Sequence, residues 1–297
     1  MVANGQRFRD TPEMAPASDD QRRRSFREQF QDFAAGPDAN LDVATGALLI
    51  TGEDSHAVDI EQTLAAFEQL ADAVRPQLQG AGSDHDLVAR LNRALFEEQQ
   101  FRGNREDYYD PRNSYLDVVV ERRLGIPITL SIVYVEVARR LGIDAHGVGF
   151  PGHFLTRVNG DQDAVFVDAF GGQTLSRADC ERQLQSQFGP RAELAPELLA
   201  PTEPRQILTR VLSNLKQIYA QRGQVETAIA CCDRALLLLP DNPTELRDRG
   251  LLYRSIECFG PAADDLERFL TLAPPGAETQ PLSALVRELR ERASRLQ

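Results

Sequence analysis

The chain has 297 residues, of which 42% are hydrophobic and 26% charged, enough for one large globular domain or two ordinary ones. Its 33 Lys and Arg against 45 Asp and Glu give a formal net charge of −12. That charge argues against nucleic-acid binding, because neutralising phosphates needs a basic face. No apolar run approaches the ~20 residues of a membrane-spanning helix, and the N-terminal residues lack the apolar core of a secretory signal.

The four cysteines form no CxxC pair of metal-binding spacing and are too few for a disulfide framework in a chain of this length. Free thiols without a signal peptide favour the cytosol. We therefore expect a cytoplasmic protein with no metal, no cofactor, no membrane contact and no nucleic-acid partner.

Residues 1–24 are polar and end in three arginines, which predicts a disordered tail. Periodic apolar residues begin at Ser25 and predict a short helix that ends near Gly36. Residues 60–78 predict an amphipathic helix. A further helix is expected at residues 87–98, with Ser83 or Asp84 as its cap.

The middle of the chain predicts helices followed by an antiparallel sheet, an α+β arrangement. After an ordered loop at residues 101–114, helices are expected at residues 116–124 and 127–141. Pro127 suits the first turn of the second helix and Gly142 its end. Strands are expected at 148–150, 153–158 and 164–170, the last two joined as a hairpin across Asn159-Gly160-Asp161.

The last hundred residues carry an internal repeat. Three pairs of identical residues are each 34 positions apart: Tyr219 and Tyr253, Ala228 and Ala262, Pro240 and Pro274. This period is typical of tetratricopeptide repeats, so we expect two repeats and a polar capping helix at 283–296. The predicted organisation is a tail (1–24), a mixed domain with a helical lead-in (25–200) and a repeat segment (205–297).

The clearest candidate for chemistry is a histidine and carboxylate on the predicted hairpin. His153 heads one strand and faces Asp168 near the end of the other. Such a pair is the base and orienter of a nucleophilic triad. It is also a common way to satisfy a buried histidine, and spacing alone favours that second interpretation. His56, His85 and His146 are expected at the surface.

No residue in the sequence supplies an obvious nucleophile. The helix behind the sheet starts at Pro127 and carries no cysteine, although a reactive thiol is usually placed at a helix N-terminus. Thr129 and Ser131 near the helix start are much weaker nucleophiles, and Cys180 follows the sheet. Two further thiols, Cys232 and Cys258, are expected to be packed in the repeat core.

The loop before this helix offers two interpretations. Asn113, Tyr108 and Tyr109 could line a cleft beside the sheet. Alternatively, Asn113 caps the helix near Leu116 and the tyrosines pack the loop, which is the interpretation we favour.

The run from Phe101 to Val158, FRGNREDYYDPRNSYLDVVVERRLGIPITLSIVYVEVARRLGIDAHGVGFPGHFLTRV, closely resembles the SirB-type family of transglutaminase-like proteins. With the lead-in and the repeats, the resemblance covers about residues 25–297. It implies a papain-type core in which a cysteine begins the central helix and His and Asp lie on the following strands. By this resemblance His153 and Asp168 match the His and Asp positions, and Pro127 occupies the position of the cysteine.

These observations lead to two functional hypotheses. The first is a non-catalytic protein that acts as an interaction or regulatory module, with the repeats binding an unknown protein or peptide. In a variant of this hypothesis the repeats only pack on the first domain. The alternative is a hydrolase or acyltransferase in which His153 and Asp168 work with an unconventional nucleophile or an activated water.

Overall fold

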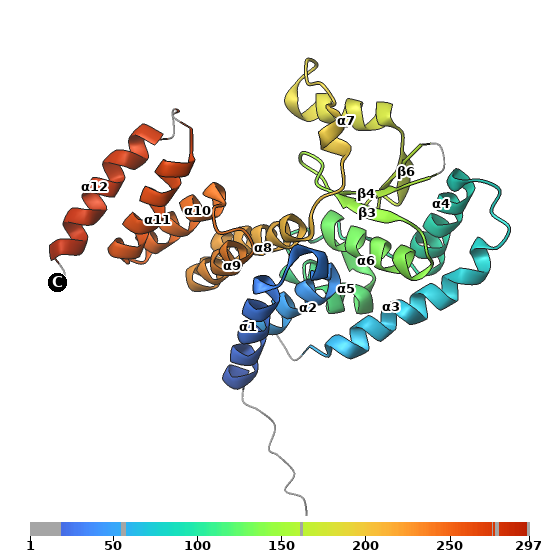
Figure 1. The fold of residues 1–297 in the computed structure, drawn as a ribbon, viewed down its shortest axis with the longest axis horizontal. Helices are drawn as coiled ribbons and strands as arrows, with labels where there is room; N and C mark the ends of the chain where they lie inside the picture. The colour runs from blue at the N-terminus through green and yellow to red at the C-terminus, as the bar shows by residue number, and fades with distance from the viewer. Residues whose placement is uncertain (1–18, 55–57, 161–162, 275, 277–278, 296–297) are drawn as a thin grey trace, which may run out of the picture.

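The computed structural model describes residues 19–54, 58–160, 163–274, 276 and 279–295. Figure 1 shows helices gathered around a small sheet, with an arm of paired helices that extends away from them toward the C-terminus. The α+β class predicted from the sequence is confirmed, with a helical lead-in, a central helix with an antiparallel sheet, and a helical repeat segment.

The lead-in starts earlier than the sequence predicts. Residues 19–24, assigned to the tail, form the first turns of a helix, where Asp19 and Asp20 complement the positive end of the helix dipole. Residues 1–18 of the predicted tail lie outside the described residues. Ser83 caps the fourth helix, as predicted, by accepting a hydrogen bond from the Asp86 amide. The elements are α1 (Asp19–Ala35), η1 (Asp38–Asn40), α2 (Val43–Asp54), α3 (Ile60–Val74), η2 (Arg75–Leu78), α4 (Asp84–Asn92) and η3 (Arg93–Glu98).

The central helix α6 is buried along almost its whole length. It begins at Pro127 and runs to Arg140, and Gly142 follows it with a φ of +76°, a conformation that suits glycine. The loop predicted at residues 101–114 contains two short elements, β1 (Arg102–Gly103) and η4 (Pro111–Asn113). Between this loop and α6 lie α5 (Leu116–Arg122) and β2 (Leu124–Gly125), and β2 pairs with β1 in parallel.

Four strands form an antiparallel sheet in the order β3–β4–β5–β6. They are β3 (Ala145–Val148), β4 (Leu155–Val158), β5 (Val165–Asp168) and β6 (Gln173–Leu175). One face contacts α6. The other face contributes Val148, Leu155 and Phe166 to a second apolar cluster with α7 (Arg177–Phe188) and the segment around η5 (Pro196–Leu199).

Two strand predictions differ from the structure. The first strand ends at Val148 because residues 150–153 form a tight turn, in which the His153 amide donates to the Phe150 carbonyl at 3.0 Å and Gly152 has a φ of +66°. His153 therefore precedes β4 and does not lie within it. Strand β6 was not predicted, because its short exposed sequence carries no apolar alternation.

The repeat segment consists of helix pairs, as predicted. Its helices are α8 (Pro204–Gln221), α9 (Val225–Leu238), α10 (Pro243–Ser255), α11 (Phe259–Leu272) and the capping helix α12 (Thr279–Arg295). Helices α8 and α9 pack together, as do α10 and α11, and α12 packs on α11. Ala228 and Ala262, which are 34 residues apart, are both fully buried at equivalent places in the two pairs.

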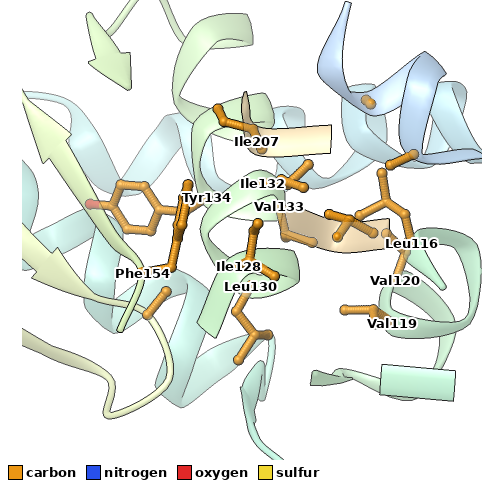
Figure 2. Packing of buried hydrophobic residues seen from close by; sticks show 14 of the residues in the cluster. Leu116, Val119, Val120, Ile128, Leu130, Ile132, Val133, Tyr134, Phe154 and Ile207 are labelled. Carbon is orange, nitrogen blue, oxygen red and sulfur yellow. The ribbon is translucent and has the colours of Figure 1, made fainter. Parts of the chain in front are cut away.

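The first repeat is part of the main hydrophobic core. Figure 2 shows Ile207 of α8 beside Ile132 and Val133 of α6, and all three belong to one buried cluster. The second repeat and α12 bury a separate cluster, which includes Ala262, Leu266 and Val286. The first repeat therefore packs on the preceding domain, which is one of the two roles that the sequence left open.

Candidate functional site

The start of α6 is fixed by a set of buried hydrogen bonds. The Ile126 amide donates to the Thr129 hydroxyl oxygen at 3.1 Å, and that hydroxyl donates to the Asn113 carbonyl at 2.7 Å. Pro127 occupies the first helical position, where its missing N–H leaves no helical hydrogen bond unmade. The Thr129 hydroxyl therefore bonds to the backbone at the start of α6 and is not directed toward a reacting group.

His153 and Asp168 are in contact. The His153 Nε2 atom lies 2.9 Å from Asp168 Oδ1, and both side chains are largely buried. The same carboxylate oxygen accepts hydrogen bonds from the backbone amides of Phe170, at 3.1 Å, and Gly171, at 3.0 Å. A Cβ atom at position 171 would lie 2.5 Å from Asp168 Oδ2, so this close approach requires glycine.

The pKa of Asp168 lies below its ordinary value. Burial of the carboxyl acts to raise the pKa, but the hydrogen bonds from His153 and from the two backbone amides outweigh that effect. The carboxylate is consequently ionised at neutral pH and orients the imidazole through Nε2. The Nδ1 side of the ring is left as the edge that could meet another group.

A small cavity of about 40 Å³ is lined by three of the candidate residues predicted from the sequence: Tyr108, Pro127 and His153. Its lining brings Pro127 and His153 together and adds two residues of the repeat segment, Arg210 and Asn214 of α8. The full lining is Tyr108, Pro127, Ile128, Gly152, His153, Phe154, Arg210 and Asn214. The first repeat therefore completes one wall of this site.

Arg210 holds the turn that carries His153. Its Nη2 atom donates to the His153 carbonyl at 2.6 Å, and both Nη atoms lie 3.4 Å from the Phe150 carbonyl. Its guanidinium carbon lies 5.4 Å from the centroid of the Phe154 ring. Neither Arg210 nor Asn214 is among the candidate residues predicted from the sequence. Their only sequence signal is that two polar residues stand four positions apart on one helix face, which is too common to be informative.

The alternative nucleophiles do not line this cavity. The Ser131 hydroxyl is buried, faces a separate cavity of about 30 Å³, and has no hydrogen-bond partner among the described residues. Cys180 is buried in the second apolar cluster, with Val148 and Phe150, and burial raises the pKa of its thiol to about 11. A thiol with this pKa is almost entirely protonated at neutral pH and is a poor nucleophile.

The loop before α5 is arranged differently from the interpretation favoured by the sequence. Asn113 is not the cap of α5, because the N-cap position is Tyr115. The buried Asn113 amide instead donates to the Asp107 carbonyl, at 2.7 Å, and accepts a hydrogen bond from Asn104. Tyr108 and Tyr109 are 41% and 52% exposed, and Tyr108 lines the cavity. Asn113 therefore neither caps α5 nor lines the cavity. Tyr108 lines the cavity, and its ring also packs against Tyr109, as the favoured interpretation predicts, and against Phe170.

The other thiols and histidines lie away from the cavity. Cys231 and Cys232 are buried in the first repeat, but Cys258 is exposed, so its predicted core position is wrong. It stands at the N-cap of α11, at the start of that helix and outside its packed face. His146 is exposed and lies 2.8 Å from Asp144, and His85 is exposed too. His56 lies outside the described residues.

Neither a metal-binding cluster nor a membrane-spanning helix is found in the described ranges. Within them, no group of three or more His, Cys, Asp and Glu side chains could hold a metal ion. No helix in the same ranges is long and apolar enough to cross a bilayer.

Comparison with known families matches both parts of the chain. A model of the transglutaminase-like superfamily matches residues 61–213, and a tetratricopeptide-repeat model matches residues 215–294. Among solved structures, the crystal structure of menin that reveals the binding site for the Mixed Lineage Leukemia protein aligns with this chain. The alignment covers 84% of this chain and 70% of the menin chain. That alignment has a TM-score of 0.36 and 9% identity, and no inference is drawn from it.

Relatives are similar along most of the chain. A UPF0162 protein of Xylella fastidiosa is 37% identical over 82% of this chain and 89% of its own length. The UPF0162 protein PA3419 of Pseudomonas aeruginosa is 32% identical over 84% and 91%. Protein SirB1 of Salmonella typhimurium is 27% identical over 74% and 81%. The chain therefore belongs to the SirB1 and UPF0162 family, which combines a transglutaminase-like domain with C-terminal tetratricopeptide repeats.

Proposed function

We propose that this chain is a cytoplasmic, non-catalytic interaction module that binds a protein or peptide segment in a groove between its two repeats. The observation that carries this proposal is a groove of about 520 Å³ between α8 and α10. Helix α8 lines it with Ser213, Lys216, Gln217 and Gln221, and α10 lines it with Asp248, Leu251 and Leu252. A groove of this volume, lined by leucines and by polar side chains, suits a ligand that buries a few side chains.

The base of the groove is rigid. Lys216 Nζ donates to Glu245 Oε2 at 2.8 Å and to Asp248 Oδ2 at 2.7 Å, so its charge is compensated within the protein. These bonds join α8 of the first repeat to α10 of the second and fix the width of the groove. A preorganised surface loses less conformational entropy when it binds a partner.

Pro127 supports the absence of catalysis. The position at which a thiol would attack a substrate carries a side chain with no nucleophilic atom and no titratable proton. Among the described residues, the cavity beside His153 is lined by no cysteine, serine or threonine that could replace it.

A charge placed in the groove tests the interaction proposal. Gln217 is exposed on α8, so Gln217→Arg should leave the fold intact but obstruct the groove and weaken peptide binding by about tenfold or more. The measurement is selection of peptides from a displayed library by the full chain, followed by titration of the selected peptides. The matched control is Gln29→Arg on the exposed face of α1. Equal binding by the two variants would contradict the groove as the binding site.

A second candidate function follows from the intact His153–Asp168 pair. A base oriented by a carboxylate beside a cavity could activate water, which would make the chain a hydrolase, or an acyltransferase if an acceptor replaced the water. Under the non-catalytic proposal, His153→Ala changes stability alone. We expect it to lower the free energy of unfolding by about 1–3 kcal/mol, because the largely buried Asp168 loses a hydrogen-bond donor.

Two measurements separate these functions. In denaturant unfolding, the control His146→Ala should lower the free energy of unfolding by less than His153→Ala does, because the contact of His146 with Asp144 is exposed. Turnover of amide, thioester and amine-transfer substrates should be absent from wild type and from both variants. Turnover by wild type that disappears in His153→Ala would establish the enzyme and overturn the non-catalytic proposal.

A further inference from the structure

Arg210 is a cation whose charge is not balanced by the protein. Its hydrogen bonds run to the carbonyls of Phe150 and His153, and no carboxylate lies within ion-pair distance of it among the described residues. The guanidinium has five N–H donors, and its Nε–H makes no hydrogen bond within the same residues. Burial lowers the pKa of Arg210, opposed by the nearby Tyr108, and this is consistent with a charge that lacks an anionic neighbour.

The cavity beside Arg210 accommodates one small group. Its volume of about 40 Å³ is a few times the ~10–15 Å³ that a cavity needs to hold one water molecule. A carboxylate fits this space, whereas a whole ligand does not. Any larger molecule that reaches Arg210 must therefore lie mainly outside the cavity.

A row of polar side chains leads from this cavity to the repeat groove. Asn214 lines the cavity with Arg210, and Gln217 and Gln221 line the groove. Positions 210, 214, 217 and 221 fall on one face of α8, at helical spacing. The three amide side chains make no hydrogen bonds to other described residues, so their donors and acceptors are available to a ligand.

The length of this row matches an extended peptide. Eleven residues of α-helix span about 16 Å at 1.5 Å per residue, and about five residues of extended chain cover the same distance. An extended peptide presents backbone N–H and C=O groups along its length, which amide side chains bind well. The charges favour an acidic ligand, because Lys216 in the groove is already neutralised and Arg210 is not.

We propose that an extended acidic peptide lies along α8 from the repeat groove and inserts a carboxylate beside Pro127 and His153, where Arg210 binds it. This proposal rests on the peptide-binding function above and specifies the chemistry of the partner. It assigns the cavity beside His153 a role as an anion subsite. Both Nη atoms of Arg210 donate to backbone carbonyls, so the Nε–H is the donor left for one carboxylate oxygen, in a charge-assisted hydrogen bond.

The carboxylate could come from an Asp or Glu side chain or from a peptide C-terminus, and matched probes distinguish the two. Three pools of fluorescein-labelled hexapeptides are compared, and their variable positions exclude Asp and Glu. One pool has a fixed Glu and an amidated end, one has a fixed Gln and an amidated end, and one has a fixed Gln and a free C-terminal carboxylate. Fluorescence anisotropy with the full chain measures the affinity for each pool.

We expect wild type to bind one of the two carboxylate pools about tenfold more tightly than the neutral pool, since a hydrogen bond to a charged group contributes about that much. Preference for the Glu pool identifies a side chain as the source, and preference for the free-acid pool identifies a C-terminus. Arg210→Gln should remove the preference, so that the variant binds all three pools with equal affinity.

The control is Arg222→Gln on the same helix, where the guanidinium donates to the Tyr109 carbonyl. It should keep the preference. Asn214→Ala, which keeps the charge, should weaken binding of all pools equally. Thermal unfolding of each variant identifies any that have lost the fold.

Equal binding of all three pools by wild type, or a preference that survives Arg210→Gln, would overturn the carboxylate subsite. If Gln217→Arg still abolished that uniform binding, the proposed function would stand without the subsite. No binding of any pool, and none from a displayed library, would count against the proposed function itself.

Discussion

Replacing Arg234 by methionine should lower the free energy of unfolding by about 3–5 kcal/mol. Arg234 lies on α9 and its side chain is 3% exposed. It donates to Asp54 Oδ1 at 2.6 Å and to the Ile50 carbonyl at 3.2 Å, and Glu53 Oε2 lies 3.7 Å away. Because Ile50, Glu53 and Asp54 belong to α2, this arginine joins the first repeat to the lead-in. Methionine keeps an unbranched apolar stem but is shorter than arginine, so the substitution removes the charge, the donors and the volume of the guanidinium group.

The loss is large because two carboxylates would remain buried near each other. Burial already raises the pKa of Asp54, and the charge and hydrogen bond of Arg234 only partly oppose this. Without Arg234 the pKa should rise further. A folded-state pKa above the unfolded value means that the folded protein binds more protons, so stability falls as pH increases through the folded pKa. The variant should therefore regain stability between neutral and mildly acidic pH.

Urea unfolding of wild type and variant at neutral and mildly acidic pH measures both effects. The matched control is Arg268→Met, because Arg268 forms an exposed ion pair with Asp241 at 2.7 Å. Such a pair contributes about 0–1 kcal/mol. If Arg234→Met costs no more than this control, or loses stability on mild acidification, the buried cluster does not join the two parts as described.

Local signals in the sequence predicted most of the elements. Pro127 and Gly142 mark the two ends of α6, and the 34-residue spacing of Ala228 and Ala262 predicted the repeat helices without any knowledge of their packing. The errors fall where a local pattern is weak. Strand β6 lacks alternation, and β3 is displaced by the turn at Gly152.

The candidate site was predictable only where its members are close in sequence. His153 and Asp168 are 15 residues apart on one hairpin, so antiparallel pairing brings them together. Arg210 is 57 residues from His153, and nothing local indicates that α8 packs against the turn at residues 150–153. Asn113 was assigned to a helix cap because Asn is common there, whereas its buried amide instead holds the preceding loop together. Long-range packing decided these placements.

A thiol introduced at the start of α6 should be unusually reactive. Pro127→Cys places the sulfur at a helix N-terminus, in the cavity shared with His153 and Arg210. The helix dipole and nearby cationic groups stabilise a thiolate and lower the thiol pKa. Proline at the first helical position donates no hydrogen bond, so the exchange leaves the helix ladder unchanged. At neutral pH we expect alkylation by iodoacetamide about tenfold faster than for an ordinary exposed thiol.

The chain supplies its own reference thiols for this measurement. Cys258 is exposed, while burial raises the pKa of Cys180 to about 11 and of Cys231 to about 12. Mass-spectrometric mapping of the alkylated peptides compares the new thiol with Cys258 in one sample. Adding His153→Ala should slow the new thiol and leave Cys258 unaffected. If the new thiol is alkylated no faster than Cys258, or at the same rate with and without His153→Ala, the cavity does not have the geometry of a triad. The fast, His153-dependent reaction would instead indicate that Pro127 is the residue that keeps this site from acting as a cysteine nucleophile.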